Sequence, residues 1–125
     1  HKGLLEKILQ KEIISGYTNQ QWTGCSTIQF AKLCHNIITN NSFDELRNHS
    51  QVFHFVPLGP ISKYTVVKTF AQIIDPQYRI KETQDKTITR TLTTKFFDTL
   101  QMNEYTNDIV EIMNELINFE KRIDK

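Results

Sequence analysis

The stretch from Gly16 to Thr27 holds the side chains best suited to bind a small molecule. It combines two aromatic residues, Tyr17 and Trp22, with several amide and hydroxyl side chains, and a helix is expected to begin directly after it. Aromatic rings stack on a base or sugar, amides and hydroxyls bind sugar hydroxyls, and a helix N-terminus favours an anion. Two interpretations stay equally open, because Trp22 could instead fill the core while the polar residues form turns.

Arg90 is a second candidate, in a Thr-rich stretch from Thr87 to Thr94 that is expected to be extended. In a strand, Arg90 shares one face with Ile88 and Leu92. An arginine in such a place usually pairs with a carboxylate or extends to water. Its planar guanidinium also matches phosphate oxygens bidentately. From these residues alone, the structural pairing is favoured over phosphate binding.

Tyr64 and Lys68 have the Y-x-x-x-K spacing that short-chain dehydrogenases use for proton transfer. Residues i and i+4 share a helix face, so that the ammonium can lower the pKa of the tyrosine. However, Tyr64 begins the apolar stripe of its expected helix, and no nucleotide-binding βαβ unit precedes it. We therefore expect a packed tyrosine beside a solvated lysine.

Composition excludes several function classes. The 125 residues suffice for one domain, and 15 Lys and Arg against 14 Asp and Glu leave a net charge of +1, which argues against a general nucleic-acid binder. No apolar run reaches the ~20 residues of a membrane span. The four His and two Cys lack metal-ligand spacing, and two lone thiols fit the cytoplasm. The four Gly are too scattered for a GxGxxG or P-loop motif.

The apolar pattern predicts four to five helices alternating with short strands, an α/β (α+β) fold. Helices are expected at residues 4–9, from a Ser26–Gln29 capping box to residues 39–42, from Ser62 to just before Pro76, at 94–100, and from Asn107 onward. Strands are expected at 12–17, 52–56, 78–82 and 87–94, with a loop at 18–24 and a turn at 58–60.

Three segments of the chain resemble one known family in their order and spacing. They are residues 16–32 (GYTNQQWTGCSTIQFAK), 53–64 (FHFVPLGPISKY) and 89–92 (TRTL). Together they resemble the C-terminal half of extended short-chain dehydrogenases that act on sugar nucleotides, the group related to dTDP-4-dehydrorhamnose reductase. The resemblance covers most of residues 3–100. It implies that residues 1–125 are a single domain, the small substrate-binding lobe of such an enzyme without its Rossmann half.

The same resemblance implies that catalysis belongs to the other half of the enzyme. NAD(P) and the catalytic Tyr and Lys are expected on that N-terminal Rossmann half, so this chain has no cofactor, no metal and no catalytic residue of its own. Tyr64 and Lys68 fall in the lobe's own helix. The absence of an initiator Met and of a glycine-rich motif agrees with a chain that is part of a longer enzyme.

The resemblance also assigns roles to the candidate residues. It implies that Trp22, Thr23, Gly24 and Thr27 shape the wall facing the sugar nucleotide, and that Arg90 meets the diphosphate. The expected function is nucleotide-sugar binding in an NAD(P)-dependent reductase or epimerase that makes deoxysugars for surface polysaccharide in the cytoplasm.

The expected partners are the nucleotide sugar and the N-terminal Rossmann domain, with no nucleic acid and no membrane. Apolar surface left without the Rossmann half is expected to favour homo-oligomers. An alternative of another class is a non-catalytic interaction module of the same fold. Trp22 stands where the reductases often have Gln, and Ser26 where they often have Pro, which is compatible with lost substrate binding.

Overall fold

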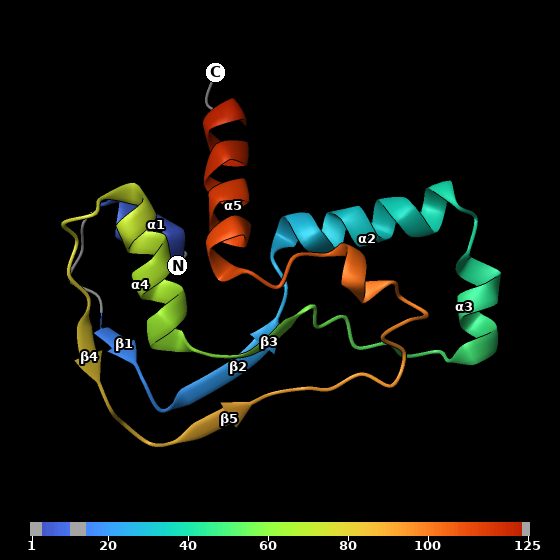
Figure 1. Ribbon diagram of the computed structural model, residues 1–125, viewed down its shortest axis with the longest axis horizontal. Coiled ribbons are helices and arrows are strands. Elements are labelled where there is room, and N and C mark those ends of the chain that lie inside the picture. Colours follow the sequence, from blue (N-terminus) through green and yellow to red (C-terminus); the bar gives the residue numbers. More distant parts are fainter. Residues whose placement is uncertain (1–3, 11–14, 124–125) are drawn as a thin grey trace.

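The computed structural model describes residues 4–10 and 15–123, which form the expected mixed α/β structure (Figure 1). The elements in chain order are α1 (Leu4–Leu9), β1 (Ser15–Tyr17), β2 (Gln20–Gly24), α2 (Thr27–Thr39), α3 (Phe43–His49), β3 (Leu58–Ser62), α4 (Lys63–Ile74), β4 (Lys81–Thr83), β5 (Ile88–Arg90), the 3₁₀ helix η1 (Met102–Glu104) and α5 (Ile109–Ile123). None of the described helices is long and apolar enough to cross a membrane.

The strands form two small sheets. β1 pairs with β4 in parallel, and the second sheet has the order β3-β2-β5, in which β2 is antiparallel to β3 and parallel to β5. Residues 15–24 and 81–90 therefore run side by side through both sheets (Figure 1). This pairing brings two segments that are distant in the sequence onto one surface.

Asn19 holds the bend between the two sheets. Its side-chain Oδ1 accepts a hydrogen bond from the backbone N–H of Asp85 at 3.3 Å, and its Nδ2 donates to the Asp85 carbonyl. The backbone N–H of Ile88 donates to the Asn19 carbonyl at 3.3 Å, so that β5 begins in register with β2. The Asn19 side chain thus takes the place of strand-to-strand backbone hydrogen bonds in the gap between the two sheets.

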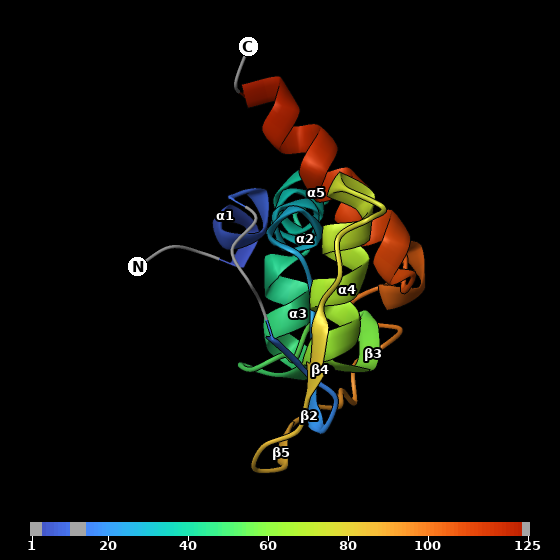
Figure 2. The ribbon, with the colours of Figure 1, turned by 90° about the vertical axis from the view of Figure 1, so that its left-hand side faces the viewer.

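The helices lie together on one side of the strands (Figures 1 and 2) and divide the interior into two cores. α1, α4 and α5 form the first core, whose buried side chains are Ile8, Val67, Phe70, Ala71, Met113 and Ile117. The second core lies under α2 and contains Leu33, Leu100 and Met102. α5 stands between the two halves of the molecule.

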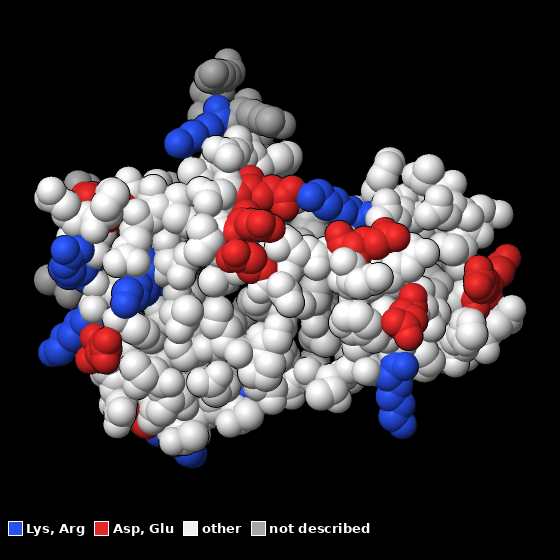
Figure 3. All heavy atoms as spheres, in the orientation of Figure 1, with Lys and Arg blue, Asp and Glu red and all other residues white. Residues whose placement is uncertain are grey.

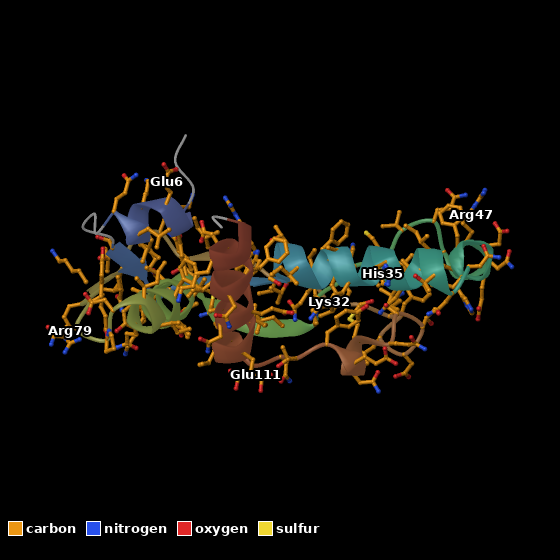
Figure 4. All side chains as sticks on the ribbon, turned by 90° about the horizontal axis from the view of Figure 1, so that it is seen from above. Glu6, Lys32, His35, Arg47, Arg79 and Glu111 are labelled. Carbon is orange, nitrogen blue, oxygen red and sulfur yellow. The ribbon has the colours of Figure 1, made fainter. Side chains whose placement is uncertain are left out.

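Acidic side chains gather on the lower part of α5 where it faces α2 (Figure 3). Lys32 of α2 forms an ion pair with Glu115 there, and Thr106 donates a hydrogen bond of 2.6 Å to Glu111. Lys32 and Glu111, both labelled in Figure 4, line a hollow between the two helices. Because both partners of the ion pair are partly exposed, it contributes little to stability.

Several predicted elements are confirmed. α1, α2 and α4 occupy the expected ranges, α5 begins two residues after Asn107, and the predicted strand at 87–94 contains β5. The strand predicted at 78–82 is present as β4, shifted to Lys81–Thr83. Of the strand predicted at 12–17, residues 12–14 lie outside the described residues and Ser15–Tyr17 form β1.

Four predictions are wrong. The loop expected at 18–24 contains β2, the central strand of its sheet, because β3 and β5 occupy both of its edges. The strand expected at 52–56 is irregular chain, whose Phe53 and Phe55 pack on Phe96 and Tyr105 with ring centroids 4.8 and 4.9 Å apart. The helix expected at 94–100 is a series of turns instead.

The turn expected at 58–60 is also wrong, since these residues lie in β3. Pro60 lacks an N–H, yet β3 is an edge strand and its pairing with β2 is irregular between Trp22 and Gly24, where Gly59 and Pro60 fall. Proline is tolerated at such irregular edge positions. The irregularity therefore explains how a sequence typical of a turn is held in the sheet.

Candidate functional site

A groove of about 490 Å³ lies between β2, β5 and the beginning of α4, and it brings together two residues singled out from the sequence. Trp22 and Arg90 are direct neighbours in the parallel register of β2 and β5. The lining residues are Gln20, Gln21, Trp22, Lys63, Val66, Ile88 and Arg90. The pairing of β2 with β5 is therefore what assembles the site.

Gly24 makes room for the Trp22 indole. A Cβ atom added at Gly24 would lie 2.0 Å from Cζ2 of Trp22 and 2.7 Å from Cε2, well inside van der Waals contact. The ring thus lies along β2 directly over the Gly24 backbone, and Trp22 remains 38% exposed. Gly24 does not line the groove itself, but it sets the position of the residue that does.

The charged side chains of the groove are both cationic. No Asp or Glu is among its lining residues, and no ion pair or hydrogen bond joins the Arg90 guanidinium to another described residue. The carboxylate partner favoured for Arg90 by its sequence context is therefore absent from the described part of the chain. Lys63 has its Nζ 5.3 Å from the centre of the Tyr17 ring. Two such cations favour an anionic ligand.

Thr23 does not line the groove and instead bonds to the chain that follows β5. It is only 6% exposed, its Oγ1 accepts a hydrogen bond of 2.8 Å from the Leu92 N–H, and the same hydroxyl donates to the Leu92 carbonyl at 3.4 Å. These bonds tie β2 to the chain just after β5. Thr23 thus holds the chain two residues after Arg90 and is not a lining residue of the groove.

The beginning of α2 is closed by the predicted capping box. Ser26 Oγ accepts from the Gln29 N–H at 3.1 Å, and the Gln29 side chain accepts from the Ser26 N–H at 3.0 Å. Gln29 also donates to the Thr106 carbonyl at 2.8 Å, which anchors α2 to the chain before α5. Thr27 is exposed in the first turn of α2 and is not a lining residue of the groove. The structure therefore separates Thr27 from Trp22 and Arg90.

Tyr64 and Lys68 are arranged as a packing pair. The Lys68 Nζ lies 5.3 Å from the centre of the Tyr64 ring, and β1 approaches so closely that a Cβ on Gly16 would be 2.6 Å from Tyr64 Cδ2. Neither residue lines the groove. This agrees with the expected packed tyrosine beside a lysine.

Sequence reasoning missed Lys63 as a lining residue of the groove. Lys63 is the first residue of α4, directly after the N-cap Ser62, whose Oγ accepts from the Thr65 N–H at 3.1 Å. The sequence does carry a signal for Lys63, because the first residue of a helix that follows a strand lies beside the end of that strand. The sequence predicts Gln20 and Gln21 only as loop amides, because it does not predict β2.

Other reactive groups in the described residues do not form a site. No group of three or more His, Cys, Asp or Glu side chains that could hold a metal ion occurs in residues 4–10 and 15–123. Burial raises the pKa of the Cys25 thiol, which disfavours the nucleophilic thiolate. Comparisons with known protein families, with curated proteins and with solved structures find no match to this chain.

Proposed function

We propose that this chain binds a nucleotide sugar in the groove between β2, β5 and α4, as the substrate-binding lobe of an NAD(P)-dependent reductase or epimerase. The observation that carries the proposal is the register pairing of Trp22 with Arg90 in a groove that holds Lys63 and no carboxylate. An aromatic ring beside two cations fits a ligand with a flat ring and a diphosphate.

Each lining side chain has a role that its chemistry suits. The Arg90 guanidinium binds diphosphate oxygens through its two parallel N–H groups, while Lys63 adds a second positive charge. The Trp22 indole packs against the base or the sugar ring. Gln20 and Gln21 can donate to and accept from sugar hydroxyls. The volume of about 490 Å³ lies in the range of small-molecule sites.

In this proposal the chain orients the substrate and the chemistry takes place on a partner domain. An N-terminal Rossmann domain of the parent enzyme would hold NAD(P), which would supply hydride chemistry at the sugar carbonyl carbon. The present chain supplies specificity and closes over the substrate. The product is a deoxysugar for surface polysaccharide, made in the cytoplasm.

Trp22 provides a direct assay, because it is the only tryptophan of the chain. Titration with UDP-, GDP- and dTDP-sugars should change its fluorescence, and calorimetry should give the dissociation constants. Arg90→Ala should weaken binding by about tenfold or more, since it removes a charge-assisted contact. Arg47→Ala is the matched control, because it also removes one guanidinium but lies on α3, far from the groove (Figure 4).

Two results would count against this function. Equal weakening by Arg47→Ala and Arg90→Ala would mean that net charge, and not the groove, governs binding. Failure of every sugar nucleotide to bind the wild-type chain would favour the second candidate, a protein-interaction module. The observation behind that candidate is the outward face of α2, where Phe30 is 54% and Ile38 is 78% exposed.

The interaction module has its own test. A Phe30→Ser/Ile38→Ser variant should abolish self-association, as measured by light scattering. These exposed side chains lie on α2 and are not lining residues of the groove, so the same variant should leave nucleotide-sugar binding unchanged. The two functions can therefore be distinguished with one pair of measurements.

A further inference from the structure

A second cavity, of about 530 Å³, lies in the other half of the molecule and shares no lining residue with the groove. It is enclosed by α2, α3 and the chain from Asp98 to Tyr105, which Figure 1 shows around the right-hand end of the fold. Its volume also lies in the range of small-molecule sites. Nothing in the proposed function uses it.

The bottom of this cavity is aliphatic. Leu33, Ile37, Leu46 and Leu100 line it, and Leu33 and Leu100 belong to the second core. A wall built from core side chains is held in place by the packing of the fold. It offers a fixed apolar surface on which the C–H face of a small ring can pack.

The rim of the cavity is built from groups that both donate and accept hydrogen bonds. Asn36, Asn40 and Gln101 contribute amides, and Ser42 and Thr99 contribute hydroxyls. Asn36 uses its Nδ2 to donate to the Tyr105 hydroxyl at 3.2 Å, so that its Oδ1 remains an acceptor for a ligand. Such a rim complements a ligand that carries several hydroxyl groups.

The charge of the lining distinguishes this cavity from the groove, because the cavity is lined by carboxylates and the groove by cations. Glu45 and Asp98 line it together with His49, no Lys or Arg does, and neither carboxylate forms an ion pair with a described residue. Arg47, on the same helix as Glu45, lies instead over the Phe43 ring at 5.8 Å. Two carboxylates accept hydrogen bonds from hydroxyls and repel phosphate. The cavity therefore suits a ligand without negative charge.

We infer that this cavity is a second binding site, specific for a neutral sugar unit. The C–H face of the sugar ring packs on the aliphatic floor, and its hydroxyls bond to the amides and carboxylates of the rim. The site excludes sugar phosphates, whereas the cationic groove requires an anion. The inference does not depend on the proposed function, since the two sites have different linings.

Titration of the isotope-labelled chain with methyl glycosides of glucose, galactose and mannose, followed by NMR, tests the inference. At least one glycoside should shift the amide signals of Asn36, Asn40 and Leu46 saturably, with a dissociation constant on the order of 1–10 mM. The Trp22 indole signal should stay unchanged. Glucose 6-phosphate should bind at least tenfold more weakly than the best neutral sugar.

The charge argument has its own variants. Glu45→Gln/Asp98→Asn should bring the affinity for glucose 6-phosphate to within about twofold of that for the neutral sugar. Both side chains are exposed, so the variant should fold, which circular dichroism checks. Asp44→Asn is the matched control, because Asp44 is also an exposed α3 carboxylate but does not line the cavity. It should preserve the preference for the neutral sugar.

Three outcomes would overturn the inference. They are no saturable shift with any neutral glycoside up to about 100 mM, shifts confined to the groove around Trp22, and a preference of the wild-type chain for glucose 6-phosphate. None of these outcomes bears on nucleotide-sugar binding, which is measured separately through Arg90.

Discussion

Replacing Gly24 with alanine should displace the Trp22 indole without unfolding the sheet. The added methyl would lie 2.0 Å from Trp22 Cζ2, so one of the two groups must move. The Gly24 backbone is fixed by its pairing in β2, whereas Trp22 is 38% exposed and its ring can rotate toward solvent. We therefore expect the ring to leave its place over β2.

The expected change in stability is small because two effects oppose each other. About 150 Å² of the indole is covered, which is worth about 4 kcal/mol. Moving the ring off Gly24 exposes about a third of that area and costs about 1 kcal/mol. Alanine in a strand is about 0.5–1 kcal/mol better than glycine. The free energy of unfolding should thus stay within about 1 kcal/mol of wild type.

Binding should be more sensitive than stability, because the groove loses one wall. Nucleotide-sugar affinity should fall by about tenfold, or ~1.4 kcal/mol. The emission maximum of Trp22 should shift to longer wavelength as the ring enters water. Gly59→Ala is the matched control, since a Cβ at Gly59 in β3 meets no atom within 4 Å. It should leave both emission and affinity unchanged.

The reasoning is refuted if Gly24→Ala leaves the emission maximum and the affinity at wild-type values. It is also refuted if the variant loses several kcal/mol of stability, since that would mean the backbone moved and the ring did not.

Three further changes have defined outcomes. Ser26→Ala should remove about 1 kcal/mol from the free energy of unfolding in urea, because it breaks the capping box that closes α2. Thr23→Val should cost about 1–3 kcal/mol, since it leaves the Leu92 N–H without its partner, and Thr23→Ser should restore most of the loss. Burial raises the pKa of the Cys25 thiol. In a Cys34→Ser background, the alkylation of Cys25 should therefore reach half its maximal rate at a higher pH in the folded chain than in urea. Because the folded thiol holds its proton more tightly than the unfolded one, the free energy of unfolding should fall as pH rises through the thiol range. Identical pH profiles in both states would contradict the burial of this thiol.

The helices could be predicted from the sequence because their signals are local. Ser26 and Gln29 lie three residues apart and form the expected capping box. At the start of α4, Ser62 Oγ accepts from the Thr65 N–H without the reciprocal bond. The acidic first turn of α5 is likewise a local signal. These contacts need no information about the rest of the chain.

The strands could not be predicted as well, because pairing decides them. Residues 52–56 contain strong β-formers but pair with no strand, and Gly59 and Pro60 are in β3 because they pair with β2. The groove could not be predicted for the same reason. Trp22 and Arg90 could be named individually, but their adjacency and the presence of Lys63 depend on the register of β2 with β5.

The bend at Asn19 has a kinetic consequence. It joins residues separated by 66 positions, so that closing this loop costs about 4 kcal/mol of chain entropy before any strand contact compensates for it. Helices with local contacts should therefore form first, and the parallel pairing late. In stopped-flow refolding, native Trp22 fluorescence should appear in the slowest phase. The chain acquires its helical scaffold before it acquires the ability to bind.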